Sequence, residues 1–295
     1  MRNRFARMAA WGTTGLGLLA AAPVLAQQAL ERVGKPQPGG THWQPAATEL
    51  ADDIHWLDGM LLVIIAAICL LVLALLAIVI LRFNRRANPE PARFTHNSVL
   101  EVAWTVAPIL ILIVIGAFSL PILFKQLRIP DADLTIKVTG HQWYWSYEYP
   151  DHDVAFDALM LGSGKARMDD ALRAELAEYG YTEDEWRLAT DNAMVVPVGA
   201  VVRLQVTAAD VIHSWTIPAF GVKMDAIPGR LNETWFKADR VGMYFGQCSE
   251  LCGKDHAYMP IVVKVLPKAD YDAWLAEAKV ALGTSPAAPI RLARN

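Results

Sequence analysis

Two long stretches without a single charged residue constrain this chain more than any other feature of its sequence. They cover residues 59–81 and 102–124, and each contains 23 residues. A helix of that length rises about 34 Å, enough to cross roughly 30 Å of hydrocarbon. Buried helices of soluble proteins seldom stay apolar for so long, and only 19% of the whole chain is charged. The sequence therefore predicts two transmembrane helices, at 57–82 and 99–124.

The charges in the short flanking segments predict the orientation of this hairpin. The segment between the two apolar runs carries four arginines up to Arg93, whereas the segment before the first run carries four acids from Glu49 to Asp58. Basic residues of short loops favour the cytoplasmic side. We therefore place the loop 83–98 in the cytoplasm and everything after about Lys125 outside.

The N-terminus has the order of residues typical of an export signal. Three arginines precede an apolar stretch, and Val24 and Ala26 are small residues at the two positions that a signal peptidase inspects. A third membrane helix is the alternative, which several glycines and Pro23 disfavour. We predict a signal peptide over residues 1–26 and an extracytoplasmic segment over 27–56.

The region after the hairpin has the pattern of an all-β domain. Short segments rich in β-branched and aromatic residues are separated by Gly, Pro, Asp or Asn, which is typical of a sandwich or a small barrel. The expected strands are 134–139, 143–149, 193–196, 201–207, 214–217, 234–237, 243–245 and 261–266. Helical spacing at about 163–190 predicts a surface insertion, and residues 267–295 are expected to form a last helix and a tail.

One segment, GQCSELCGKDHAYMP at 246–260, holds Cys248, Cys252, His256 and Met259 in steps of four, four and three. In an oxidising compartment a disulfide is the default for two cysteines so close together. A disulfide has no use for the histidine and the methionine, whereas thiolate, imidazole and thioether ligands together suit copper. This neighbourhood favours a metal site.

A further ligand is expected from another strand, and His213 in DVIHSW lies at a predicted strand end. A mononuclear blue copper site would use two histidines, one cysteine and a weak methionine, and would leave the second cysteine exposed to oxidation. Two thiolates can instead bridge two copper ions, with one histidine on each. Burying thiolates also costs less when cations neutralise them.

With DVIHSWTIPAFGVKMDAIPGR and GHQWYWSYEYPD, the cysteine segment resembles subunit II of haem–copper cytochrome c oxidase. The resemblance extends from the first membrane helix to about residue 275, and the export signal and the insertion are similar to the bacterial aa3-type branch. It implies a membrane-anchored all-β protein, in which a transmembrane hairpin precedes a cupredoxin-like β-barrel at 130–266. It also implies a bacterial inner membrane, with the N-terminus and the C-terminal domain in the periplasm.

The resemblance implies the cofactors as well. A dinuclear copper centre, CuA, would be held by His213, Cys248, Cys252, His256 and Met259 and by the main-chain carbonyl of Glu250. The Glu250 side chain would bind a magnesium or manganese ion shared with subunit I. Haem a and haem a3–CuB are implied only in subunit I.

The resemblance further implies the route of electrons and protons. Trp143 would accept electrons from cytochrome c, which pass through CuA to haem a of subunit I for oxygen reduction coupled to proton pumping. Glu101 would lie at the entrance of a proton pathway into subunit I. Without the resemblance, Trp143 is a residue of a half-buried strand and Glu101 a charge at a helix start.

The outer region is acidic, with 13 Lys/Arg against 21 Asp/Glu between residues 131 and 270, a net charge of −8. Such a surface attracts a cationic protein. We therefore predict docking of cytochrome c, with subunits I and III and the lipid bilayer as further partners and no nucleic acid. The acids expected at the docking site are Glu148, Asp151, Asp153, Asp157, Asp191 and Asp210.

Three alternatives compete with this interpretation. Subunit II of a quinol oxidase has a similar architecture but lacks the cysteines and the ligand histidines. The CuA domain of nitrous oxide reductase shares the ligand spacing but would need neither the two membrane helices nor Glu101. A membrane-anchored β-domain that is held by a Cys248–Cys252 disulfide and only binds a partner would contain no copper.

Overall fold

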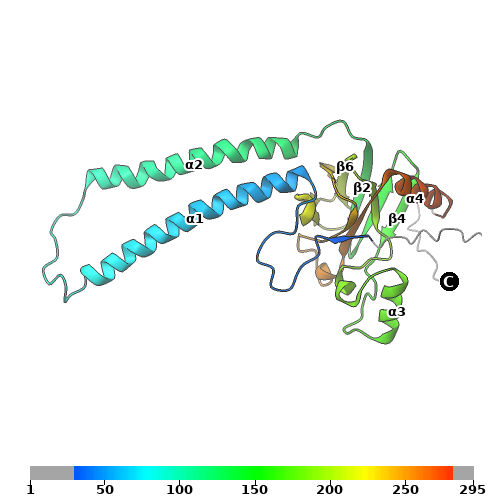
Figure 1. Cartoon of the computed structure of the whole chain (residues 1–295), viewed down its shortest axis with the longest axis horizontal. Helices are drawn as coiled ribbons and strands as arrows, with labels where there is room; N and C mark the ends of the chain where they lie inside the picture. The colour runs from blue at the N-terminus through cyan, green and yellow to red at the C-terminus, as the bar shows by residue number, and fades with distance from the viewer. Residues whose placement is uncertain (1–29, 282–295) are drawn as a thin grey trace, which may run out of the picture.

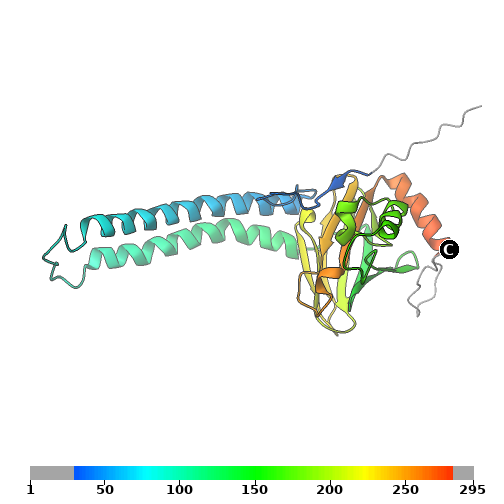
Figure 2. The same cartoon turned by 90° about the horizontal axis from the view of Figure 1, so that it is seen from below.

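A computed structural model of the chain describes residues 30–281. Two long helices, α1 (Glu49–Arg82) and α2 (Ser98–Leu127), project side by side from one side of a β-rich domain (Figures 1 and 2). The predicted signal peptide at 1–26 and the tail after 281 lie outside the described residues. The loop between the helices lies at the end of the hairpin farthest from the domain (Figure 1).

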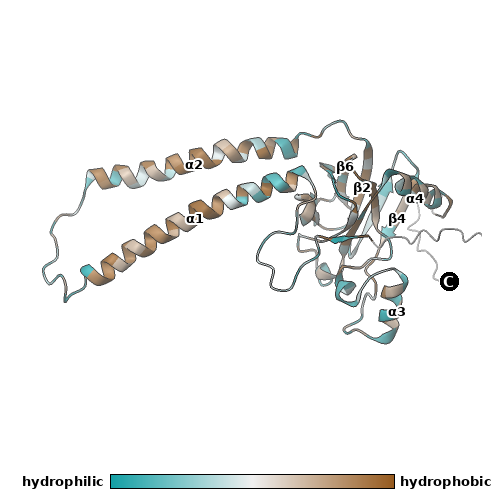
Figure 3. Ribbon diagram, viewed as in Figure 1, coloured by the Kyte–Doolittle hydropathy of each residue, from teal (hydrophilic) through white to brown (hydrophobic). Residues whose placement is uncertain are grey.

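The two helices are apolar along most of their length and bury almost none of it against this chain (Figure 3). Both are long and apolar enough to cross a membrane. α1 begins ten residues before its uncharged run, because Thr48 caps it by accepting a hydrogen bond from Ala51 N. Asn97 caps α2 in the same way. The existence of both predicted helices is confirmed.

Most of the β-domain lies in two sheets. One has the strand order β1-β10-β11-β5 and the other the order β4-β3-β2-β6-β9, while β7 and β8 form a separate two-stranded pair. The strands are β1 Arg32–Val33, β2 Leu134–His141, β3 Tyr144–Tyr149, β4 Val154–Ala158, β5 Met194–Pro197, β6 Val201–Ala208, β7 His213–Ile217, β8 Val222–Ala226, β9 Asn232–Lys237, β10 Gly242–Gln247 and β11 Pro260–Leu266.

Alternation of buried and exposed residues builds the core between the sheets. In β2 and β6 every second residue is buried, as expected for strands with one face in a core. Trp145, Trp215 and Phe236 are among the largest side chains without exposed surface. The predicted cupredoxin-like all-β domain behind a two-helix hairpin is confirmed.

Three strands were not predicted from the sequence. β1 has only two residues and pairs in parallel with β10, where Arg32 lies opposite Met243. β4 and β8 carry acidic or basic residues within five-residue segments, which hides the pattern of a strand. Their partners, β3 and β7, supply the hydrogen bonds that hold them extended.

The predicted insertion forms helix α3 (Asp170–Glu178) and the 3-10 helix η1 (Glu183–Leu188). It has a small core of its own, in which Leu172, Leu176 and Trp186 pack with Met243 and Phe245 of β10. The insertion therefore covers the outer face of the sheet that contains β10 and β11. The last described element is α4 (Lys268–Ala281).

Direct contacts hold the hairpin to the domain. The Thr48 hydroxyl donates a hydrogen bond to the Phe220 carbonyl at 2.8 Å. Gly221 allows the close approach of the first turn of α1, since a Cβ atom there would lie 2.9 Å from the Ala51 Cα. At the end of α2, the Trp235 indole donates to the Lys125 carbonyl at 3.3 Å. Within the hairpin, Lys125 of α2 pairs with Glu49 and Asp53 of α1 at 2.5 and 2.6 Å.

Candidate metal centre

The loop between β10 and β11 carries most of the predicted metal ligands. We call residues 248–259 the ligand loop. Cys248 follows the last residue of β10, and Met259 precedes the first residue of β11. The two strands pair from Gly242↔Val265 to Gln247↔Pro260, so both ends of the ligand loop are anchored in the same sheet.

The side chains of the ligand loop converge on the two cysteines. The Cys248 and Cys252 sulfur atoms are 3.9 Å apart. His256 Nδ1 and Met259 Sδ each lie 3.5 Å from the Cys252 sulfur. On the other side, the Glu250 carbonyl oxygen lies 3.3 Å from the Cys248 sulfur.

His213 completes the cluster from a different part of the chain. It is the first residue of β7, and its Nδ1 lies 3.9 Å from the Cys248 sulfur. Its other ring nitrogen, Nε2, is 2.8 Å from the Asp210 carboxylate. That contact leaves Nδ1 free to act as a ligand. A Cβ atom on Gly140 would lie 2.9 Å from the His213 ring, so this position needs glycine.

Electrostatics distinguish the two thiols. Burial opposes ionisation of Cys248, but hydrogen bonds with His213, the backbone and His256 outweigh it and lower the pKa of this thiol. Burial and the neighbouring Cys248 thiolate raise the pKa of Cys252. The pKa of His213 is raised, since Cys248 and Asp210 outweigh the effect of its burial. A cation between the thiols would remove the repulsion that keeps Cys252 protonated.

The donor set fits copper. Among the described residues, one group of at least three His, Cys, Asp or Glu side chains has all its ligand atoms within 4.8 Å of one another. The group consists of His213, Cys248 and Cys252. Both cysteines are free, and their 3.9 Å separation is far longer than the S–S bond of about 2.05 Å. Two thiols, imidazoles and a thioether form a soft set that suits copper rather than magnesium or calcium.

Trp143 lies beside the ligand loop. Its indole donates to the Cys252 carbonyl at 3.3 Å, and the Gln142 side-chain amide donates to the same oxygen at 2.9 Å. The ring of Trp143 is partly exposed, and the Lys254 ammonium lies 5.4 Å from its centre. One aromatic side chain thus connects the protein surface to a cysteine of the cluster.

Trp145, which lies within the predicted strand 143–149, also contacts the site although no sequence signal singled it out. It is fully buried, donates to the Met259 carbonyl at 3.3 Å, and meets the His213 ring edge-on at 5.9 Å between centres. The alternating pattern of β3 could indicate only that the side chain is buried. The role of Asp210 in orienting His213 was missed too, and the short spacing to the histidine was its one signal.

The six predicted docking acids differ in their surroundings. Asp151 and Asp153 are exposed in the turn between β3 and β4, and Asp210 is exposed near His213. Glu148 pairs with Lys137 at 2.9 Å. Asp157 is buried and accepts a hydrogen bond from Ser146 at 2.6 Å. Asp191 accepts from the backbone of Leu159 and Asn192.

Glu101 lies in the first turn of α2, at the end of the hairpin that is remote from the β-domain (Figure 1). It is only partly exposed, and its carbonyl accepts a hydrogen bond from the Thr105 hydroxyl at 2.8 Å. The metal ligands and Glu101 are therefore separated by the length of the helices.

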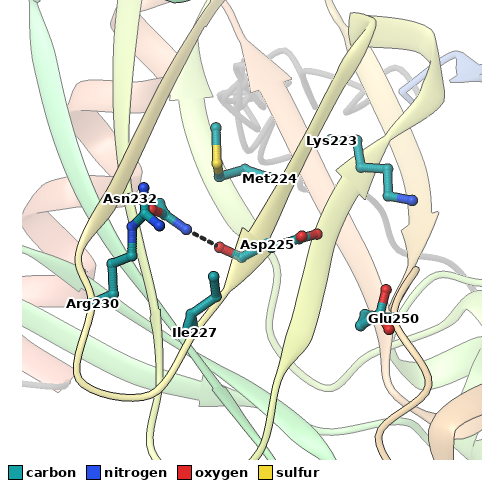
Figure 4. Close-up of a pocket in the computed structure, with 7 residues that line it drawn as sticks. All are labelled: Lys223, Met224, Asp225, Ile227, Arg230, Asn232 and Glu250. Carbon is teal, nitrogen blue, oxygen red and sulfur yellow. Dashed lines mark hydrogen bonds between the residues drawn. The ribbon is translucent and has the colours of Figure 1, made fainter.

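A polar pocket of about 450 Å³ lies next to the ligand loop (Figure 4). Its lining includes the carboxylates of Asp225 and Glu250 and the cationic side chains of Lys223 and Arg230. Asp225 accepts hydrogen bonds from the Ser214 hydroxyl and, through its carbonyl, from Asn232. The Glu250 side chain is exposed.

Two family models match the chain. The model described as the periplasmic domain of cytochrome c oxidase subunit II matches residues 134–266, and the model of its transmembrane domain matches residues 36–122.

Individual relatives match over most of their length. Cytochrome c oxidase subunit 2 of Cereibacter sphaeroides is 59% identical over 272 residues, which are 90% of each chain. The probable subunit 2 of Rickettsia bellii is 45% identical over 82% of this chain and 85% of its own. The crystal structure of the periplasmic domain of subunit II of the Bradyrhizobium japonicum cytochrome oxidase is 52% identical, with a TM-score of 0.44, over 53% of this chain and all of that one.

Proposed function

This chain belongs to the cytochrome c oxidase subunit II family, and from that premise we propose that it accepts electrons from cytochrome c at a dinuclear copper centre and passes them to haem a of subunit I. The chain is a subunit of a haem–copper terminal oxidase. The observation that carries the proposal is the convergence of His213, His256 and Met259 on two free thiols.

The residues of the chain have distinct tasks in holding the copper pair. Cys248, Cys252, His213 and His256 would hold the two ions, and Met259 and the Glu250 carbonyl would act as weaker ligands. When bound, such a pair supplies a one-electron carrier whose bonds change little between its two oxidation states. Asp210 holds the His213 ring, and burial of the thiols keeps water away from them.

Trp143 is the proposed point of electron entry. Support comes from its partly exposed ring and from its hydrogen bond to the Cys252 carbonyl. The acids Asp151, Asp153 and Asp210 are exposed and suit the docking of a cationic cytochrome c by long-range attraction. Glu148, Asp157 and Asp191 contribute to the same negative field, and these three acids, like Asp210, also have partners within the domain.

Glu250 and Glu101 are proposed to act toward subunit I. The Glu250 carboxylate would supply one oxygen ligand to a magnesium or manganese ion at the boundary. Magnesium is a hard ion that prefers oxygen ligands. Glu101 marks the entrance of the proton pathway. This role agrees with a position at the cytoplasmic end of α2, with the β-domain in the periplasm of a bacterial inner membrane and subunits I and III beside the hairpin.

The proposal is tested by loading the full-length chain in detergent with copper and recording its electron paramagnetic resonance spectrum. We expect a hyperfine pattern from one unpaired electron that is shared by two copper nuclei, together with about two copper ions per chain by metal analysis. Cys252→Ser should abolish the shared pattern, because one bridge is lost. A spectrum of one isolated copper ion in the unsubstituted chain, or no copper at all, would contradict the proposal.

A further inference from the structure

The insertion makes one contact with the ligand loop that the proposed function does not use. Arg187, in the 3-10 helix η1, places its guanidinium 5.4 Å from the ring centre of Tyr258. The same guanidinium lies 4.9 Å from the ring centre of Trp186. Arg187 is exposed, whereas Trp186 is buried in the small core of the insertion and Tyr258 is partly buried.

Tyr258 lies between two of the proposed copper ligands. His256 is two residues before it and Met259 follows it directly, all within or beside the 3-10 helix His256–Tyr258. The Tyr258 amide donates to the Asp255 carbonyl at 2.8 Å, which is a local contact. A force on the Tyr258 ring therefore acts on the backbone that carries His256 and Met259.

The insertion is itself firmly placed against the strands that flank the ligand loop. Its core residue Trp186 packs in one cluster with Phe245 of β10 and Val262 of β11. Its base is also held to the N-terminal segment, since Lys35 pairs with Asp184 at 2.5 Å and Arg32 with the buried Glu185 at 3.4 Å. Arg187 is thus presented from a fixed support and not from a free loop.

We propose that Arg187 is a positioning residue for the copper site, and that the insertion at 163–190 serves to hold its guanidinium over the Tyr258 ring. A cation over an aromatic face is attracted by the negative charge of that face. The attraction holds the His256–Met259 turn against the sheet and slows the opening through which copper escapes. The inference rests on the proposed copper function and adds a role for a segment outside the ligand set.

The test compares variants of the full-length, copper-loaded chain in detergent. Arg187→Ala should lose copper to a competing chelator about two- to fivefold faster than the unsubstituted chain, which corresponds to about 0.5–1 kcal/mol. Arg187→Lys keeps a cation over the ring and should restore most of the retention. Tyr258→Leu should behave like Arg187→Ala, and the double variant should be no worse than either, because both remove the same contact.

Arg173→Ala is the matched control. Arg173 is an exposed arginine of the same insertion that pairs with Asp170 and Glu183 and not with the ligand loop. It should leave copper loss unchanged. Thermal unfolding of the copper-free chains separates positioning from general stability, because Arg187→Ala and Arg173→Ala should then melt alike.

Each outcome decides a different question. Copper loss from Arg187→Ala at the unsubstituted rate, or equal acceleration by Arg173→Ala, would overturn the role of Arg187 and leave the copper function standing. Failure of Arg187→Lys to restore retention would also contradict it. If the unsubstituted chain binds no copper pair, the proposed function fails, and the inference that rests on it fails with it.

Discussion

The hairpin and the β-domain follow opposite rules of burial. Among the described residues, no side chain of α2 is buried, and in α1 only Leu50 and Ala51 are, next to the domain. In the domain, by contrast, large side chains such as Trp215 and Phe236 have no exposed surface. The domain therefore has a core of its own, whereas the hairpin depends on lipid and on neighbouring subunits to cover its apolar surface.

The first way to break this comparison is to remove a core side chain of the domain. Phe236 stacks on Phe220 and Trp215. Phe236→Ala should lower the free energy of unfolding of the domain by about 3–5 kcal/mol, because removal of the ring leaves a cavity. Denaturant unfolding followed by tryptophan fluorescence measures the loss. Val280→Ala, at an 88% exposed site, is the control and should change little. Membrane integration of the hairpin should be unaffected.

The converse change introduces a charge into the hairpin. Leu112 is 66% exposed in the middle of α2, so Leu112→Arg would meet hydrocarbon. We expect insertion of this helix to become less favourable by about 3 kcal/mol. The fraction of chains that resist alkaline extraction from membranes measures the effect, with Leu112→Ala as the control. Normal integration of Leu112→Arg would show that this face of α2 does not contact lipid.

Two single substitutions should separate the functions of the two regions. Trp143→Phe keeps an aromatic ring but loses the indole hydrogen bond to Cys252, and should slow electron entry from cytochrome c about tenfold, equivalent to about 1.4 kcal/mol in the barrier. The copper spectrum should not change.

Glu101→Ala should instead slow proton uptake and leave copper reduction by cytochrome c at its normal rate. Stopped-flow spectra of the assembled oxidase measure both. Slow copper reduction in Glu101→Ala would refute the division.

The smallest expected effect is within the hairpin, at its end next to the domain. Lys125→Ala removes the ion pairs with Glu49 and Asp53 that connect the outer ends of the helices. The Glu49 carboxylate is mostly exposed, so we expect a loss of only about 0.2–1 kcal/mol in thermal stability of the whole chain. High salt should reduce the difference between the variant and the unsubstituted chain. A larger loss would show that these ion pairs contribute more than exposed pairs usually do.

The sequence alone predicted the elements whose signal is local. The uncharged runs identified both helices, and the spacing of Cys248, Cys252, His256 and Met259 indicated one cluster, which the structure brings together. The resemblance drawn from three motifs is confirmed by the family matches. β4 and β8 were missed because their acidic or basic residues hide the pattern of a strand, and they are held extended by pairing with β3 and β7.

Contacts between remote segments were beyond sequence reasoning. Trp145 approaches Met259, and Arg187 approaches Tyr258, only because strand pairing and the packing of the insertion bring distant segments together. Asp210 was predicted from its charge alone, as a docking acid. Its hydrogen bond to the His213 ring depends on the conformation of Val211 and Ile212 between them, which the sequence pattern does not specify.

The hydrogen bond from Thr48 to Phe220 has a consequence for how far the β-domain can move relative to the helices. The first helix starts where it touches the domain, and the second ends at Leu127, only a few residues before β2 begins at Leu134. Neither connection between the hairpin and the β-domain is a long flexible linker. The β-domain is therefore held in one position beside the hairpin. Under the proposed function, the electron donor must diffuse to the domain, because the domain does not move to reach it.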